Sequence, residues 1–182
     1  LKVYQKVKLG VMESDIFRYC ILYDKGGYYF DISKGTKVSL RSLHKANSKA
    51  ILSNEPVECI IPPHNNLFKK LNHPHHNFLT WGLGFTKNHP IPKMMIDAIS
   101  NDYTNYIDKI FPRPKLAVLS LTATGQFTKI VREYLSSHEI EDDQLVQAGI
   151  YFNGNGIFSM KGCRVRHHLV PTYADLKNIS VI

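Results

Sequence analysis

A twenty-residue segment, Ser14 to Ser33, constrains the fold of this chain more than any other part of its sequence. It reads SDIFRYCILYDKGGYYFDIS. The apolar residues up to Tyr23 recur at helical spacing, two glycines then stop the helix, and an aromatic run follows that is typical of a buried strand. We expect Ser14 to cap the helix, Asp15 to lie in its first turn and Asp31 to end the strand. The helix start and the strand end can then converge on one crevice, where α/β proteins usually bind their ligands.

Outside that segment, predicted helices alternate with short buried strands, which indicates an α/β protein. Helices are expected over residues 40–45, 94–105 and 126–136, and strands over residues 28–32, 50–53, 78–85, 116–121, 149–158 and 163–170. Residues 54–77 are rich in Pro, Asn and His and predict a long irregular excursion. Loops of that length are uncommon unless they are functional or disordered.

The length of the chain limits its domain organisation. With 182 residues it is long enough for one domain and hardly for two. It begins at Leu1, and its first recognisable element is a helix rather than a strand. We therefore expect residues 1–182 to form a single domain that lacks an N-terminal part. No apolar run approaches the roughly 20 residues needed to span a bilayer, and no signal peptide is visible.

The net charge is +8 and is concentrated early in the chain, because residues 1–50 hold ten Lys or Arg against four Asp or Glu. A basic face of this kind can attract nucleic acid, an anionic membrane surface or a nucleotide diphosphate. No zinc-finger or RNP-type motif accompanies the basic residues, so we expect no nucleic-acid partner. The three cysteines are isolated and odd in number, which fits a reducing compartment.

Several conspicuous residues also have a plainer interpretation. Asp15 can be a residue that the helix dipole favours, and Arg18 a surface cation. Five of the nine histidines lie between His64 and His89. Such tracts can bind zinc, but no spacing here matches a zinc module, which favours a polar loop. Trp81 either stacks on a sugar or base or belongs to the core, and the core is the commoner place for a lone Trp in an apolar strand.

The segment described first resembles the sugar-transferase region of glycosyltransferase family 32. Those proteins carry a pattern close to S-D-x-x-R-y-x-x-L-y-x-x-G-G-x-Y-x-D-x-D, and a similar pattern occurs in large glucosylating toxins and capsular polysaccharide transferases. This sequence matches it at ten positions in the correct order: Ser14, Asp15, Arg18, Tyr19, Leu22, Tyr23, Gly26, Gly27, Tyr29 and Asp31. So many matches make a much more specific signal than a lone short motif.

Weaker similarity continues downstream. The stretch from Trp81 through His89-Pro90 is similar to the family segment that ends in H-P before a helix, and Thr124-Gly125 is similar to its T-G element. The resemblance therefore covers the chain from Ser14 to about Leu135. It implies the nucleotide-diphospho-sugar transferase (GT-A-like) fold, with a mixed central sheet flanked by helices. The family's first strands would precede Leu1.

The resemblance also implies an activity and its site. The expected reaction transfers a hexosyl unit from a nucleotide sugar to a glycan or lipid-linked acceptor, with retention of configuration. Asp15, Arg18 and Asp31 would be the catalytic residues, the first two binding donor hydroxyls. The expected donor-binding residues are Asp15, Arg18, Tyr29, Asp31, Ser33 and Lys34. A divalent cation, Mn²⁺ or Mg²⁺, would be held by Asp31 and Ser33 and would neutralise the diphosphate leaving group.

One position departs from the family pattern, because Ser33 stands where the second carboxylate of D-x-D is expected. A serine hydroxyl is a weak neutral ligand, so metal affinity should fall. The alternative to an active transferase is a degenerate or truncated relative that binds sugars or a partner. His167 and His168 are candidates for the family's late histidine near the diphosphate, and an exposed strand position is their plainer alternative. The expected location is cytoplasmic with a peripheral membrane contact, or the Golgi lumen in a eukaryote.

Overall fold

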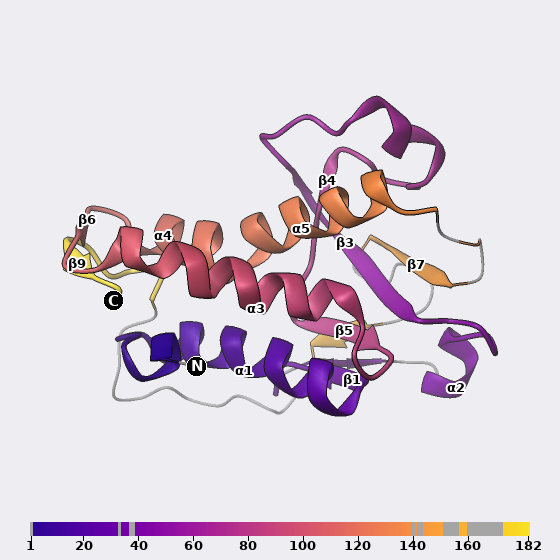
Figure 1. Ribbon diagram of the computed structural model, residues 1–182, viewed down its shortest axis with the longest axis horizontal. Coiled ribbons are helices and arrows are strands. Elements are labelled where there is room, and N and C mark those ends of the chain that lie inside the picture. The colour runs from indigo at the N-terminus through magenta and orange to yellow at the C-terminus, as the bar shows by residue number, and fades with distance from the viewer. Residues whose placement is uncertain are drawn as a thin grey trace.

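Three helices lie side by side over a mixed sheet in the computed structural model of the chain (Figure 1). The structure describes residues 2–32, 34–36, 39–139, 141, 144–150, 157–159 and 173–182. Its helices are α1 (Gly10–Lys25), α2 (Leu40–Leu43), α3 (Pro90–Asp102), α4 (Pro114–Leu121) and α5 (Thr124–Ser137), with 3-10 turns at η1 (Lys2–Gln5), η2 (Asn65–Lys69) and η3 (Tyr103–Tyr106). Its strands are β1 (Gly27–Phe30), β2 (Lys34–Thr36), β3 (Ala50–Glu58), β4 (His76–Phe78), β5 (Gly82–Phe85), β6 (Ile110–Phe111), β7 (Leu145–Ile150), β8 (Ile157–Ser159) and β9 (Ile179–Ser180).

The central sheet is built around β3. Along the sheet the order is β1-β5-β3-β4, with antiparallel pairing throughout, and β7 joins β3 in parallel. Two short antiparallel pairs, β2 with β8 and β6 with β9, lie apart from it. The expected α/β class and mixed sheet flanked by helices are therefore confirmed.

The two faces of the sheet bury different sets of side chains. Successive residues of a strand point to opposite faces. On β1, Tyr29 packs on the helix side, in the large core formed with α1, α3, α4 and α5, whereas Tyr28 and Phe30 pack on the other side with Leu43 of α2. The same alternation places Ile51 of β3 in that second, smaller cluster. Tyr29 therefore faces α1, which carries the residues of the predicted site.

A glycine makes the tight turn from α1 into β1 possible. Gly26 has φ +68°, in the left-handed region, and a Cβ there would lie 2.5 Å from the backbone nitrogen of Lys87. Its amide donates to the carbonyl of Leu22, which caps the helix. Because only glycine fits this position, α1 can turn directly into the strand that ends at Asp31.

Most predicted elements are present, and three expectations are wrong. Ser14 does not cap α1, since the helix already begins at Gly10 and buries Met12 upstream of the predicted start. Residues 116–121 form helix α4 instead of a strand, because a short apolar run does not distinguish a buried helix from a buried strand. Pro114 occupies the first turn of that helix, a position that proline favours.

The third correction concerns residues 78–85, predicted as one strand. The structure divides them between β4 and β5, with residues 79–81 between the two strands. The excursion predicted over residues 54–77 starts later, since β3 continues to Glu58, and it contains η2. The strand predicted at 149–158 corresponds in part to the end of β7 and to β8, while residues 151–156 and the predicted strand at 163–170 lie outside the described residues. Within the described part of the chain, no helix combines the length and apolar character needed to cross a membrane.

Candidate active site

Arg18 is the centre of a buried polar cluster on the inner face of α1. Its Nη2 lies 3.0 Å from Oδ1 of Asp15 and 3.2 Å from Oδ1 of Asp31. Its Nη1 donates to the carbonyl of Thr80 at 2.9 Å, and its guanidinium carbon lies 5.0 Å from the centre of the Tyr29 ring. The Nε of Arg18 is buried and has no hydrogen-bond partner among the described residues. Three separate segments of the chain therefore meet at one cation.

Asp15 is buried beside Arg18, one helical turn before it. Thr122, at the end of α4, donates its hydroxyl to Oδ2 of Asp15 at 2.7 Å. Burial raises the pKa of Asp15, and the charge of Arg18 and the hydrogen bond from Thr122 oppose that rise. The neighbouring Tyr19 donates to the carbonyl of Thr122 at 3.0 Å, which fixes α1 against the junction of α4 and α5.

Asp31 lies just after β1, at the accessible edge of the cluster. Its amide donates to the carbonyl of Trp81 at 3.0 Å, which continues the pairing of β1 with β5. Its side chain is 38% exposed, whereas those of Asp15 and Arg18 are almost fully buried. Tyr29, two residues earlier on the same strand, is half-buried, and burial raises its pKa. The cluster thus has a buried floor and one carboxylate open to a ligand.

The structure brings together four of the six residues expected to bind the donor. Asp15, Arg18, Tyr29 and Asp31 share one cluster, in which Arg18 contacts the other three. Ser33 lies outside the described residues. The backbone of Lys34 is part of β2, and its side chain lies outside the description. The plainer interpretations are wrong, because α1 begins at Gly10, which places Asp15 beyond its first turn, and because the side chain of Arg18 is buried.

Three residues near the cluster were not expected. Thr80 contributes a carbonyl and Thr122 a hydroxyl. Tyr173, near the other end of the chain, packs against the large core, and its pKa is raised by burial and then by the charges of Asp15 and Glu55. The T-G element at Thr124 was the one sequence signal close to Thr122. Nothing in the sequence signals Tyr173, since its proximity depends on how the chain returns to α1.

The described part of the chain does not assemble a metal site from its own side chains alone. It contains no group of three or more His, Cys, Asp or Glu side chains that could hold a metal ion. In the histidine-rich tract, His76 lies in β4, where its Nδ1 forms a hydrogen bond with the carbonyl of Glu55 and its ring packs edge-on against His73. At the cluster, Asp31 offers one accessible carboxylate. Mg²⁺ sites of the kind that complete their coordination with substrate phosphates and water need one or two such groups, so the cluster fits a cation that arrives with a diphosphate.

Comparison with known proteins bears on the family resemblance and on the fold. Residues 1–58 match the family model described as "Glycosyltransferase sugar-binding region containing DXD motif", which confirms the resemblance in the segment that carries Asp15, Arg18 and Asp31. A solved structure described as "PaToxG Glycosyltransferase" superposes with a TM-score of 0.50 at 19% sequence identity, over 74% of this chain and 40% of that chain. This chain thus spans less than half the length of that protein, and the likeness shows a GT-A-like fold. No curated protein matches the sequence.

Proposed function

We propose that this chain, whose first third matches the sugar-binding region of glycosyltransferases, transfers a hexosyl unit from a nucleotide sugar to a glycan or lipid-linked acceptor. In that reaction the acceptor oxygen bonds to the anomeric carbon, the nucleoside diphosphate leaves with the bonding electrons, and the acceptor proton is released to water or to the diphosphate. We further propose retention of configuration and action in the cytoplasm at the membrane periphery, or in the Golgi lumen if the protein is eukaryotic.

The observation that carries the proposal is the unpartnered Nε of Arg18. Its other two guanidinium nitrogens are occupied by Asp15, Asp31 and Thr80. A buried donor without a partner is costly, so a hydroxyl of the bound sugar is a natural acceptor for it. Asp15 is held by Arg18 and Thr122 and is pre-organised to accept from a second hydroxyl, because a carboxylate accepts up to about four hydrogen bonds.

Asp31 is the residue proposed to meet the leaving group. Its exposed carboxylate stands at the end of β1, where a divalent cation, Mn²⁺ or Mg²⁺, would be shared with the diphosphate. When bound, such a cation neutralises the charge that develops on the diphosphate. Arg18 donates a hydrogen bond to Oδ1 of Asp31 and so orients its carboxylate for this role. Ser33 and Lys34 are proposed as the remaining donor contacts on the segment that follows.

An Asp31→Ala variant tests the assignment. Turnover of nucleotide sugars is measured across a panel of donors with Mn²⁺ or Mg²⁺, and the variant is expected to lose at least a hundredfold, or about 2.7 kcal/mol of transition-state stabilisation. Asp24→Ala is the matched control, since Asp24 is an exposed carboxylate at the end of α1, outside the Arg18 cluster. Equal turnover in Asp31→Ala and the wild type would remove Asp31 from the site.

Binding measurements separate the transferase from its alternative. A degenerate relative that only binds sugars would retain nucleotide-sugar binding and show no turnover with any donor of the panel. Binding of each nucleotide sugar is titrated with and without Mn²⁺, and tighter binding with Mn²⁺ is the result expected if Asp31 and Ser33 hold a cation. A wild-type chain that binds no nucleotide sugar under either condition would contradict the proposed donor site as a whole.

A further inference from the structure

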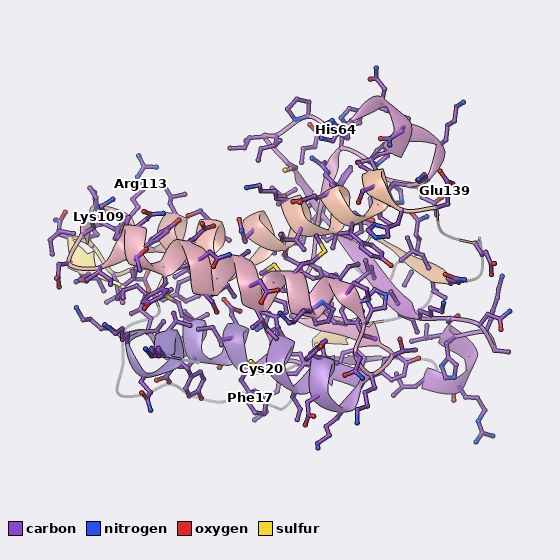
Figure 2. The ribbon with its side chains drawn as sticks, in the orientation of Figure 1. Phe17, Cys20, His64, Lys109, Arg113 and Glu139 are labelled. Atoms are coloured by element: carbon purple, nitrogen blue, oxygen red, sulfur yellow. The ribbon has the colours of Figure 1, made fainter. Side chains whose placement is uncertain are left out.

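A cavity with a mostly apolar lining and a few charged side chains lies along the C-terminal half of α5, away from the Arg18 cluster. It has a volume of about 420 Å³ and is lined from one side by residues of the 59–64 segment and from the other by α5. None of the residues that form the Arg18 cluster lines it. Figure 2 shows His64, one of its lining residues, on the excursion above α5. The proposed sugar transfer leaves this cavity without a role.

A buried arginine dominates the chemistry of this cavity. Arg132 is 4% exposed and donates through its two Nη atoms to the carbonyls of Ile61 and Pro74, which fastens both arms of the excursion to α5. No carboxylate lies within ion-pair distance of it in the described part of the chain. A buried cation whose partners are all neutral is unfavourable. An anion bound beside Arg132 would therefore offset the cost of burying its charge.

Two buried donors belong to residues that line the cavity and have no partner in the described part of the chain. The Nε of Arg132 and the hydroxyl of Ser136 are both buried and make no hydrogen bond with a described residue. Both residues line the cavity, together with Lys129. Glu133 adds one opposing charge to the lining, so the two cations leave an excess of one positive charge, before any contribution from His64. Native proteins leave few such donors unpaired unless a ligand or ordered water completes them.

We propose that this cavity binds the phosphate group of an amphiphilic phosphate ester. A phosphate offers several acceptor oxygens and can take hydrogen bonds from Arg132, Lys129 and Ser136 together, with a charge that compensates the arginine. The apolar part of the ligand is indicated by the opposite wall, which contains Ile61 and Pro62. Ile60, between two lining residues, is 98% exposed, and Val57 and Ile61 are also exposed. An apolar rim beside an anion site fits either a lipid headgroup or a soluble ester.

Calorimetric titration of the whole chain tests this site without any sugar donor. The probes are inorganic phosphate and dihexanoyl phosphatidic acid, a soluble lipid phosphate, at constant ionic strength. The wild type is expected to bind both saturably, and Lys129→Gln/Ser136→Ala is expected to weaken both at least tenfold. These substitutions leave the contacts of Arg132 with the excursion intact, and the unfolding midpoint without phosphate verifies that the variant folds.

Arg113→Gln is the matched control, because it removes one exposed positive charge beside α4, away from His64 (Figure 2). It should bind both probes as the wild type does. Ile60→Ser distinguishes the two sources of phosphate. Selective weakening of the lipid probe assigns a lipid headgroup, and unchanged binding of both probes assigns a soluble phosphate ester.

The proposal is overturned if the wild type binds neither probe saturably, if Lys129→Gln/Ser136→Ala binds as well as the wild type, or if Arg113→Gln weakens binding equally. The titration is repeated with Asp31→Ala. Binding at the α5 cavity should persist in that variant. The phosphate proposal can therefore fail or hold independently of the proposed donor site.

Discussion

At the scale of single residues, Arg18 both holds three segments of the fold together and belongs to the proposed donor site. It connects the middle of α1, the end of β1 and the segment before β5, because its two Nη atoms reach Asp15, Asp31 and Thr80. Ion pairs in the interior lose their hydration, so their stability depends on complete pairing. Removing Arg18 would leave Asp15 buried without its cation, with the hydroxyl of Thr122 as its hydrogen-bond donor.

We therefore expect Arg18→Ala to destabilise the protein by about 3–5 kcal/mol, the cost of breaking a buried pair from one side. The measurement is urea unfolding of the wild type and the variant. Lys25→Ala is the control, because Lys25 pairs with Asp24 on the surface of the same helix, and it should give no measurable change. A loss below about 1 kcal/mol for Arg18→Ala, the size found for exposed pairs, would mean that the cluster is open to water.

At the scale of elements, the sequence predicts the helices whose apolar residues recur regularly and the helix end that is marked by glycine. The helix now called α5 keeps its apolar stripe through Phe127, Ile130 and Val131 and was predicted nearly to its bounds. The stop at Gly26 was also predicted, since its backbone requires glycine. Helix α4 was missed because an unbroken apolar run has no period to read.

The site was predictable only in part, for a related reason. Asp15, Arg18 and Asp31 lie within one short segment and follow a family pattern, so the sequence contained them together. Thr80 and Thr122 were not predictable, because each meets Arg18 or Asp15 across more than sixty intervening residues. Such contacts depend on how α1 packs on the sheet and on α4, which no local pattern encodes.

Helix α3 provides a pH-dependent prediction at the same scale. His89 caps α3, since its Nδ1 accepts a hydrogen bond from the amide of Ile91. Burial and, to a lesser extent, the positive charge of Lys49 lower the pKa of His89 from an ordinary 6.5 to about 4. The folded state thus binds the proton less readily than the unfolded state. The stability that this neutral histidine contributes is complete above pH 6.5 and is lost as the pH falls toward 4, to a total of roughly 3 kcal/mol.

His89→Asn isolates that contribution, because asparagine is a good N-cap that does not titrate. Urea unfolding is measured for both proteins between pH 4 and 7.5. The wild type should lose stability relative to His89→Asn as the pH is lowered, and the two curves should run parallel above pH 6.5. A constant difference across the whole range would contradict the lowered pKa of His89.

At the scale of the whole molecule, the first and last described residues belong to one core. Val3, Val7 and Leu9 share the large cluster with Val181 and Ile182. The amide of Lys8 donates to the carbonyl of Val181 at 3.0 Å, and its Nζ donates to that of Ile182 at 2.8 Å. The labelled ends of the chain accordingly lie on the same side of the molecule, the C-terminus next to β9 and the N-terminus by the start of α1 (Figure 1). The final segment therefore supports the helix layer.

Because that segment also carries Tyr173 to the Arg18 cluster, loosening it should affect stability and donor binding together. We expect Val181→Ala/Ile182→Ala to destabilise the protein by about 2–4 kcal/mol, from lost burial of two aliphatic side chains. Below the unfolding transition, the folded variant should also bind a nucleotide sugar more weakly, since Tyr173 would be less firmly placed. Lys177→Ala, an exposed change in the same segment, should alter neither quantity. Loss of stability with unchanged donor affinity would separate the core role of this segment from any role at the site.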